Sequence, residues 1–116
     1  MKKVYHLGKC NTCQRILKEL KWDGVQQEIR VEKITEMQLI EMAELAGSYE
    51  ALFSRRAIKY KSMKLKEKSL SEADCKKLIL EEDTFLKRPV FIINEQIFIG
   101  NAKKVIEAVQ AILVEE

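Results

Sequence analysis

The chain has 116 residues, of which 47% are hydrophobic and 34% are charged, and its formal net charge is +3. This length and balance are typical of one globular domain and exclude a disordered chain. No apolar run is long enough to cross a bilayer, and the apolar stretch after residues 1–3 is too short for a signal peptide. We therefore expect a cytoplasmic protein with no membrane partner.

The first thirty residues predict a β-α-β unit. Residues 2–7 alternate in polarity and include β-branched and aromatic side chains, which indicates a short strand. A helix capped by Asn11 or Thr12 should follow and run to about Trp22. Residues 25–31 then predict a second strand.

The middle of the chain predicts helices. Apolar side chains recur at helical spacing over residues 35–46, with Thr35 as the cap and Gly47 as the stop. A short helix is predicted over residues 48–53. A capping box that begins at Ser71 predicts a further helix through about residue 82.

The last part of the chain predicts two strands and a helix. Residues 90–93 and 96–99 are apolar β-formers separated by Asn94-Glu95, a hairpin signal. Residues 102–114 predict an amphipathic helix. The order β-α-β, helical insertion over about 35–85, then β-β-α predicts an α/β protein in a single domain, 1–116.

Two of the three cysteines, Cys10 and Cys13, are two residues apart and stand at the start of the first predicted helix. A thiol with an ordinary pKa near 8.5 is a weak nucleophile until it ionises, and a helix N-terminus favours the thiolate. We expect Cys10 to be the attacking thiolate. Cys13, one turn later, would resolve the bond that Cys10 forms.

Two other interpretations of the cysteine pair stay open. A zinc site usually needs four ligands, and only His6 and Cys75 remain to complete one, so we expect no metal. The pair could also simply pack in the core, as we expect of Cys75, because free cysteine is often buried. The β-α-β setting favours redox chemistry, since a C-x-x-C motif near that pattern is associated with thioredoxin-like proteins.

Pro89 is the only proline in the chain, and it opens the first strand of the predicted hairpin. Its fixed φ and missing N–H suit the first residue of a strand. Thioredoxin-like proteins have a cis proline at this place, facing the reactive cysteine. We therefore expect a cis Arg88–Pro89 bond, although trans is the more frequent state of such bonds.

Residues 54–68 form a basic stretch with seven Lys or Arg residues and one acid, Glu67. We interpret it as a solvated helix face. An acidic partner or DNA is the alternative, but no base-reading motif is visible, so we expect no direct contact with nucleic acid.

Four short motifs occur in this order: CNTC after the first strand, SRR near residue 55, KRP before the hairpin and IGN after it. Together they resemble the ArsC/Spx family, which includes glutaredoxin-like arsenate reductases and Spx-type transcription regulators. The resemblance covers almost the whole chain. It implies a thioredoxin-like sheet with a helical insertion.

The resemblance also implies roles for particular residues. In the reductases, a cysteine at the position of Cys10 attacks arsenate, and arginines hold the oxyanion and lower the pKa of the thiol. Arg88 matches one of these arginines and Arg56 another, with Arg55 one register away. Arginine suits this task because its guanidinium pairs with an oxyanion through two hydrogen bonds. The further residues expected to bind the anion or thiol substrate are Asn11, Thr12, Arg55, Pro89 and Asn101.

Two departures from the reductase pattern matter. Asn101 stands where the arsenate reductases have a further arginine, which weakens the case for arsenate. Cys13 is instead typical of Spx-type regulators, in which a disulfide switches contact with RNA polymerase. Gly47 lies near the glycine that serves this contact in the regulators, although it could simply end a helix.

The sequence thus predicts a thiol-dependent reductase that acts on a small thiol or an oxyanion. No flavin or dinucleotide fingerprint is visible, so we expect no bound cofactor. Glutathione, glutaredoxin or thioredoxin would supply the electrons. The alternative is a redox-sensing regulator of the Spx type whose partner is an RNA polymerase subunit.

Overall fold

The computed structural model describes residues 2–8 and 11–115. The chain divides into two compact units, which are considered one at a time. The first consists of Met1–Lys33 and Arg88–Glu116, and the second of Ile34–Lys87. The expectation of a single domain stays a prediction.

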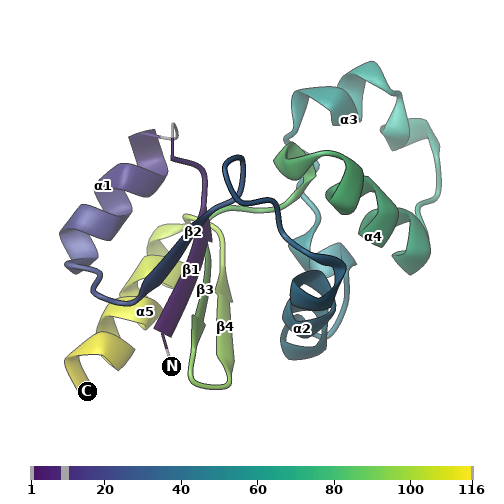
Figure 1. Ribbon diagram of the computed structural model, residues 1–116. Coiled ribbons are helices and arrows are strands. Elements are labelled where there is room, and N and C mark those ends of the chain that lie inside the picture. Colours follow the sequence, from purple (N-terminus) through teal and green to yellow (C-terminus); the bar gives the residue numbers. More distant parts are fainter. Residues whose placement is uncertain (1, 9–10, 116) are drawn as a thin grey trace. The chain divides into compact units, whose positions relative to one another are not determined.

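The first unit is a sheet with two helices. Its elements in chain order are β1 (Lys2–His6), α1 (Asn11–Leu20), β2 (Val25–Glu28), β3 (Val90–Ile93), β4 (Gln96–Ile99) and α5 (Lys103–Glu115) (Figure 1). The strands lie in the order β2-β1-β3-β4. β1 and β2 are parallel, whereas β3 is antiparallel to both β1 and β4. The predicted α/β class, with β-α-β and β-β-α parts, is confirmed.

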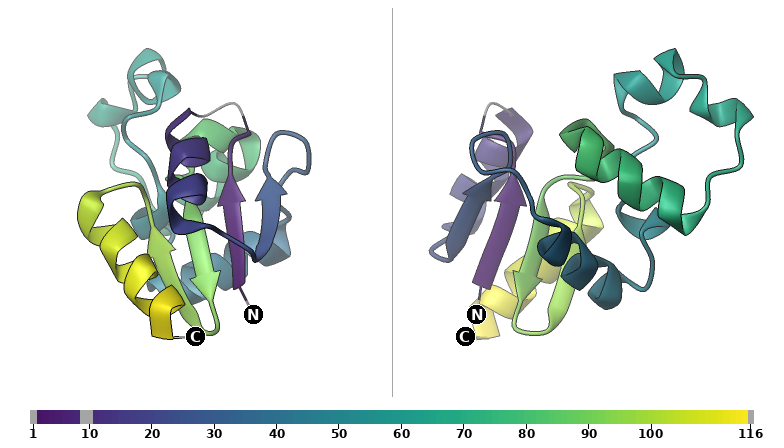
Figure 2. Two further views of the ribbon diagram at one scale, coloured as in Figure 1. Left: turned by 90° about the vertical axis from the view of Figure 1, so that its left-hand side faces the viewer. Right: turned by 45° about the vertical axis from the view of Figure 1, so that its right-hand side comes forward.

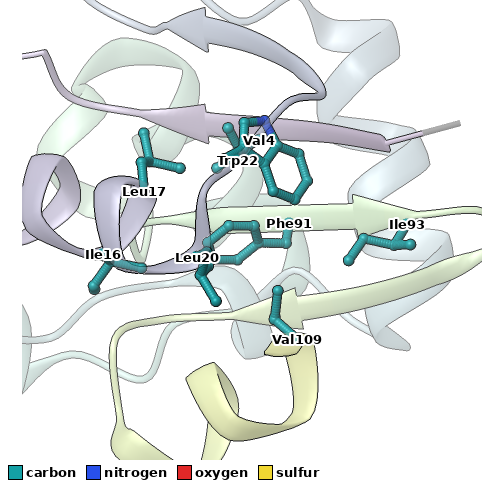
Figure 3. Close-up of a cluster of buried hydrophobic side chains, with 8 residues drawn as sticks. All are labelled: Val4, Ile16, Leu17, Leu20, Trp22, Phe91, Ile93 and Val109. Carbon is teal, nitrogen blue, oxygen red and sulfur yellow. The ribbon is translucent and has the colours of Figure 1, made fainter. Parts of the chain in front are cut away.

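Both helices of this unit pack on one face of the sheet. Their apolar side chains meet those of β1 and β3 in a single buried cluster (Figure 3). The Trp22 ring contacts the edge of Phe91, with 5.3 Å between ring centroids. The remaining members of the cluster are Val4, Ile16, Leu17, Leu20, Ile93 and Val109. This core anchors α1, and with it the segment that follows β1.

The start and end of α1 differ from the prediction. The helix begins at Asn11, so Asn11 and Thr12 are its first residues and do not precede it as caps. It ends at Leu20 because Lys21 adopts a left-handed conformation with φ of 53°. The N–H of Trp22 then bonds the carbonyl of Leu17 at 3.1 Å, which closes the helix.

β2 is shorter than predicted and ends at Glu28. The backbone turns directly afterwards, because the carbonyl of Glu28 accepts hydrogen bonds from the N–H groups of Val31 and Glu32 at 3.1 and 2.8 Å. The buried side chain of Gln27 braces the same turn by donating to the carbonyl of Glu32 at 3.0 Å. The predicted extension of the strand to residue 31 is therefore wrong.

The second unit corresponds to the predicted helical insertion and consists of short helices (Figure 2). Its α-helices are α2 (Glu36–Ala46), α3 (Ile58–Ser62) and α4 (Glu72–Glu81), and its 3₁₀ turns are η1 (Glu50–Leu52), η2 (Leu65–Glu67) and η3 (Asp83–Phe85). Thr35 and Ser71 cap α2 and α4, as predicted, and both form complete capping boxes, of which the sequence predicts the one at Ser71. Gly47 ends α2 in the left-handed conformation, with φ of 95°.

Aromatic rings fill part of the core of this unit. Phe53 stacks on Phe85 with 5.1 Å between centroids, and Tyr60 meets Phe53 edge-on at 6.1 Å. The basic stretch is not one continuous helix, because Lys64 has a φ of 55° and separates α3 from η2. α3 buries no residue, and its lysines are exposed, as expected of a solvated surface.

Candidate functional site

The strand registers bring the segments that carry the predicted site of the first unit to one end of the sheet, the upper end in Figure 1. His6, the last residue of β1, pairs with Glu28 at the end of β2. Its neighbour Tyr5 pairs with Val90, and Val90 pairs with Ile99 at the end of β4. The segments after β1, before β3 and after β4 therefore meet there, because antiparallel neighbours run in opposite directions.

Of the cysteine pair, Cys13 lies in the first turn of α1, and only 1% of its surface is exposed. Cys10, the predicted nucleophile, and its neighbour Lys9 lie outside the described residues. Asn11 and Thr12 belong to the same first turn, where Asn11 is exposed and Thr12 is half-buried. The helix thus places Cys13 facing the core and Asn11 facing outward.

Hydrogen bonds hold Gly8, the last described residue before this turn, on both sides. Its N–H donates to the Glu28 Oε1 at 2.8 Å, and its carbonyl accepts from the Gln14 Nε2 at 2.9 Å. The Gly8 bond, together with bonds from the backbone of Val31 and Arg30, lowers the pKa of the Glu28 carboxyl. Glu28 is therefore ionised and accepting at neutral pH.

The Arg88–Pro89 bond is cis, as predicted. Pro89 is buried, and its carbonyl accepts a hydrogen bond from the Gly100 N–H at 2.8 Å. This bond ties the segment before β3 to Gly100 and its exposed neighbour Asn101. Pro89 and the end of the IGN motif are therefore held together at the end of the sheet.

Arg88 is half-buried, and its Nη1 atom is fully covered without a hydrogen-bond partner among residues 2–8 and 11–115. The Nδ1 atom of the buried His6 is also covered and has no hydrogen-bond partner among the described residues. A covered donor without an acceptor costs about 1–3 kcal/mol. An anionic group that reached Arg88 Nη1 would remove this cost.

Arg55 and Arg56 belong to the second unit and differ in their contacts. Arg55 lies 3.8 Å from the carboxylate of Glu50 and over the Phe53 ring, 5.8 Å from its centroid. Arg56 is exposed, and within the described ranges its guanidinium has no ion-pair partner. The guanidinium of Arg55 thus contacts residues of its own unit, whereas the guanidinium of Arg56 makes no ion pair within the described residues.

The third cysteine, Cys75, lies in α4 and is buried, as expected of an ordinary helix residue. Burial, assisted by the nearby Glu72 carboxylate, raises the pKa of its thiol. A buried thiol that resists ionisation is unreactive at neutral pH. Cys75 therefore provides an internal reference for the reactivity of the other cysteines.

Glu28 is the residue that sequence reasoning missed. No motif marks it, because the sequence predicts Glu28 in the middle of a strand, whereas β2 ends at this residue. The described residues contain no group of three His, Cys, Asp or Glu side chains that could hold a metal ion. Within the same ranges, no helix has the length and apolar character needed to span a membrane.

Comparison with known proteins gives a consistent result. The model of the ArsC family matches residues 5–109. No curated protein matches the chain. Among solved structures, the YFFB protein is 20% identical and superposes with a TM-score of 0.81, covering 97% of this chain and 99% of its own.

Two further solved structures are similar over nearly their whole length. An arsenate reductase from Vibrio cholerae is 19% identical, with a TM-score of 0.77 and 96% of each chain covered. A protein described as a possible arsenate reductase from Streptococcus mutans is 25% identical, with a TM-score of 0.71, and 94% of this chain and 97% of that one are covered. The predicted thioredoxin-like fold of the ArsC type is confirmed.

Proposed function

The chain belongs to the ArsC family, and on that premise we propose that it is a thiol-dependent reductase with Cys10 as nucleophile and Cys13 as resolving thiol. The observation that carries this proposal is the meeting of three segments at one end of the sheet. They are the segment after β1, which leads to both cysteines, the cis Arg88–Pro89 segment and the segment with Asn101.

With a disulfide substrate, the chemistry is two successive exchanges. The Cys10 thiolate attacks one sulfur of the substrate, forms a mixed disulfide and releases the other sulfur as a thiolate that takes up a proton. Cys13 then gives up its proton and attacks the Cys10 sulfur, which releases the second substrate thiol and leaves a Cys10–Cys13 disulfide. Two equivalents of glutathione, or one dithiol of glutaredoxin or thioredoxin, reduce this disulfide.

Arg88 is the group proposed to stabilise the thiolate and a bound anion. Its covered Nη1, which has no hydrogen-bond partner among the residues that the structure describes, supports this role, because a buried donor gains most from a negatively charged acceptor. Arg56 is the better second candidate, since Glu50 and Phe53 already engage Arg55. Asn101 offers a neutral donor in place of a further cation, which favours a disulfide over arsenate as substrate.

The decisive experiment follows alkylation of each cysteine against pH by mass spectrometry. We expect the Cys10 thiol to titrate well below the ordinary value of about 8.5. Cys75 should react only when the protein unfolds, because its thiol is buried. If Cys10 reacts no faster than a small thiol near neutral pH, the proposed nucleophile is wrong.

Measurement of turnover then distinguishes arsenate from a disulfide as the substrate. Glutathione serves as the donor, and arsenate and a glutathionylated peptide serve as alternative acceptors. Cys10→Ser should abolish turnover. In a single turnover without glutathione, Cys13→Ser should leave the mixed disulfide trapped on Cys10. A matched Cys75→Ser variant should keep full activity.

The two-residue spacing of the cysteines also supports a second candidate, a redox-sensing regulator. In that case the chain would form a Cys10–Cys13 disulfide without steady turnover. Binding to an RNA polymerase subunit would then differ between the oxidised and reduced protein. Steady turnover without such binding would contradict this candidate.

A further inference from the structure

One carboxylate joins the two loops that follow β1 and β2. The Oε1 atom of Glu28 accepts from the Gly8 N–H at 2.8 Å and from the Arg30 N–H at 3.3 Å, and its Oε2 accepts from the Val31 N–H at 2.7 Å. Two of these bonds are local to the turn after β2. The third reaches back 20 residues along the chain, to Gly8.

The fit between Glu28 and Gly8 leaves no room for a side chain at position 8. A Cβ atom at Gly8 would stand 2.8 Å from the Glu28 Cγ and 3.3 Å from its Cδ. Real Cβ atoms essentially never approach another heavy atom as closely as 2.8 Å. Glycine at this position therefore lets the carboxylate lie directly against the backbone.

The bond to Gly8 belongs to a larger set of restraints on the segment after β1. The Gly8 carbonyl accepts from Gln14 of α1, and the His6 carbonyl accepts from the Ile29 N–H at 2.9 Å. The Glu28 bond is the charged member of this set, because its pKa is lowered. Hydrogen bonds to an ionised acceptor are about twice as strong as neutral ones.

We propose that Glu28 is a positioning residue, which clamps Gly8 and thereby fixes the start of the segment that carries Cys10. This inference rests on the proposed function, in which Cys10 is the nucleophile. Glu28 touches no reacting atom in this proposal and acts only through the backbone of Gly8. A thiolate stabilised by helix N–H groups needs those groups held in place, since their effect falls off within the first turn.

The sign of the effect separates positioning from simple electrostatics. If the Glu28 charge acted on Cys10 directly, it would disfavour the thiolate, so moving the carboxylate away would lower the pKa of Cys10 and speed its alkylation. Loss of the clamp would instead loosen the segment, raise the pKa of Cys10 and slow its alkylation. The two roles therefore predict opposite shifts of the pH profile.

Two substitutions break the clamp from opposite sides. Glu28→Asp shortens the side chain by one methylene, which removes the reach to Gly8 but keeps a carboxylate beside the N–H groups of Arg30 and Val31. Gly8→Ala keeps the N–H and displaces the Glu28 side chain. The matched control is Glu32→Asp. Glu32 is exposed, and its bonds to the turn come from its backbone, whose N–H donates to Glu28 and whose carbonyl accepts from Gln27.

The first readout is hydrogen exchange of the Gly8 amide, followed by NMR in the full chain. We expect exchange about tenfold faster in Glu28→Asp than in the unsubstituted protein and the Glu32→Asp control. In Gly8→Ala, the amide of residue 8 should exchange equally fast. The double variant should be no faster than either single one, because both remove the same bond. Unchanged exchange in Glu28→Asp would overturn the clamp.

The second readout is the pH profile of Cys10 alkylation in the same variants, with a thermal transition recorded to confirm folding. We expect a shift to higher pH in Glu28→Asp and Gly8→Ala and none in Glu32→Asp. Faster exchange without this shift, or a shift to lower pH, would overturn the positioning role. An ordinary Cys10 thiol in the unsubstituted protein would instead refute the proposed function, and the Gly8 exchange would still decide the clamp.

Discussion

The two units carry their predicted functional side chains in different ways. In the first unit, Cys13 is buried and Arg88 is half-buried. Side chains hold the backbone of Gly8 by hydrogen bonds, and the Gly100 N–H holds the carbonyl of Pro89. In the second unit, Arg56 and the lysines of α3 are exposed, and α3 buries nothing. The candidate residues of the first unit are therefore covered and held in place, whereas the positive charges of the second unit are exposed.

The largest loss of stability should come from substitutions in the two hydrophobic cores. Phe91 and Phe53 are both fully buried, one in each unit, so Phe91→Ala and Phe53→Ala should each cost about 3–5 kcal/mol. Because a helical unit of roughly 50 residues is marginal alone, both variants should lower one shared unfolding transition. Denaturant unfolding by circular dichroism measures this, with Val114→Ala, at an exposed site, as control. Two separate transitions would show that the units fold independently.

Substituting one arginine in each unit compares how much the two side chains contribute to kcat/KM. Arg88→Ala should lower kcat/KM by about 100-fold, since it removes the covered donor that we propose stabilises the thiolate. Arg56→Ala should lower it by only about fivefold, because exposed charges interact weakly. Glutathione-dependent reduction of a glutathionylated peptide is the assay. The control is Arg15→Ala, at an exposed residue paired with Glu19 on α1. Equal losses at Arg88 and Arg56 would refute the contrast.

Substitutions at the helix caps test how much capping stabilises the second unit. Thr35→Ala and Ser71→Ala each remove one side of a capping box and should each cost about 1 kcal/mol. Ser69→Ala, at an exposed serine outside any helix, should be nearly neutral. The midpoint of urea unfolding, at an unchanged m-value, measures the change in the free energy of unfolding. Neutral cap variants would show that packing alone maintains α2 and α4.

The smallest expected effect is a change in the free energy of unfolding at acid pH, and it comes from Glu28 in the first unit. Hydrogen bonds, above all from Gly8, lower the pKa of Glu28 in the folded state, and the charge of His6, its neighbour on β1, acts in the same direction. Its contribution is therefore complete at neutral pH and is lost as the pH falls through the folded pKa, below the unfolded value of about 4.3. The free energy of unfolding should thus differ between Glu28→Gln and the unsubstituted protein at pH 7, and this difference should shrink as the pH falls below the unfolded value. A constant difference would contradict this linkage.

Local patterns were sufficient for most elements. The caps at Thr35 and Ser71, the stop at Gly47 and the strands around Asn94-Glu95 depend on side chains within a few residues of each backbone group. The C-x-x-C spacing and the single proline likewise marked the segments that the strand registers bring together. Sequence alone therefore determined the order of elements, the family and the choice of candidate residues.

Only the tertiary structure decided how those segments are held. The bond from the Gly8 N–H to the Glu28 carboxylate and the bond from the Ile29 N–H to the His6 carbonyl both join residues that are far apart in the chain. No local rule predicts them, because a carboxylate accepts from whichever N–H groups the register of β1 and β2 places beside it. The physical reason is that hydrogen bonds and burial depend on distance in space, which the strand pairing sets and local sequence patterns do not.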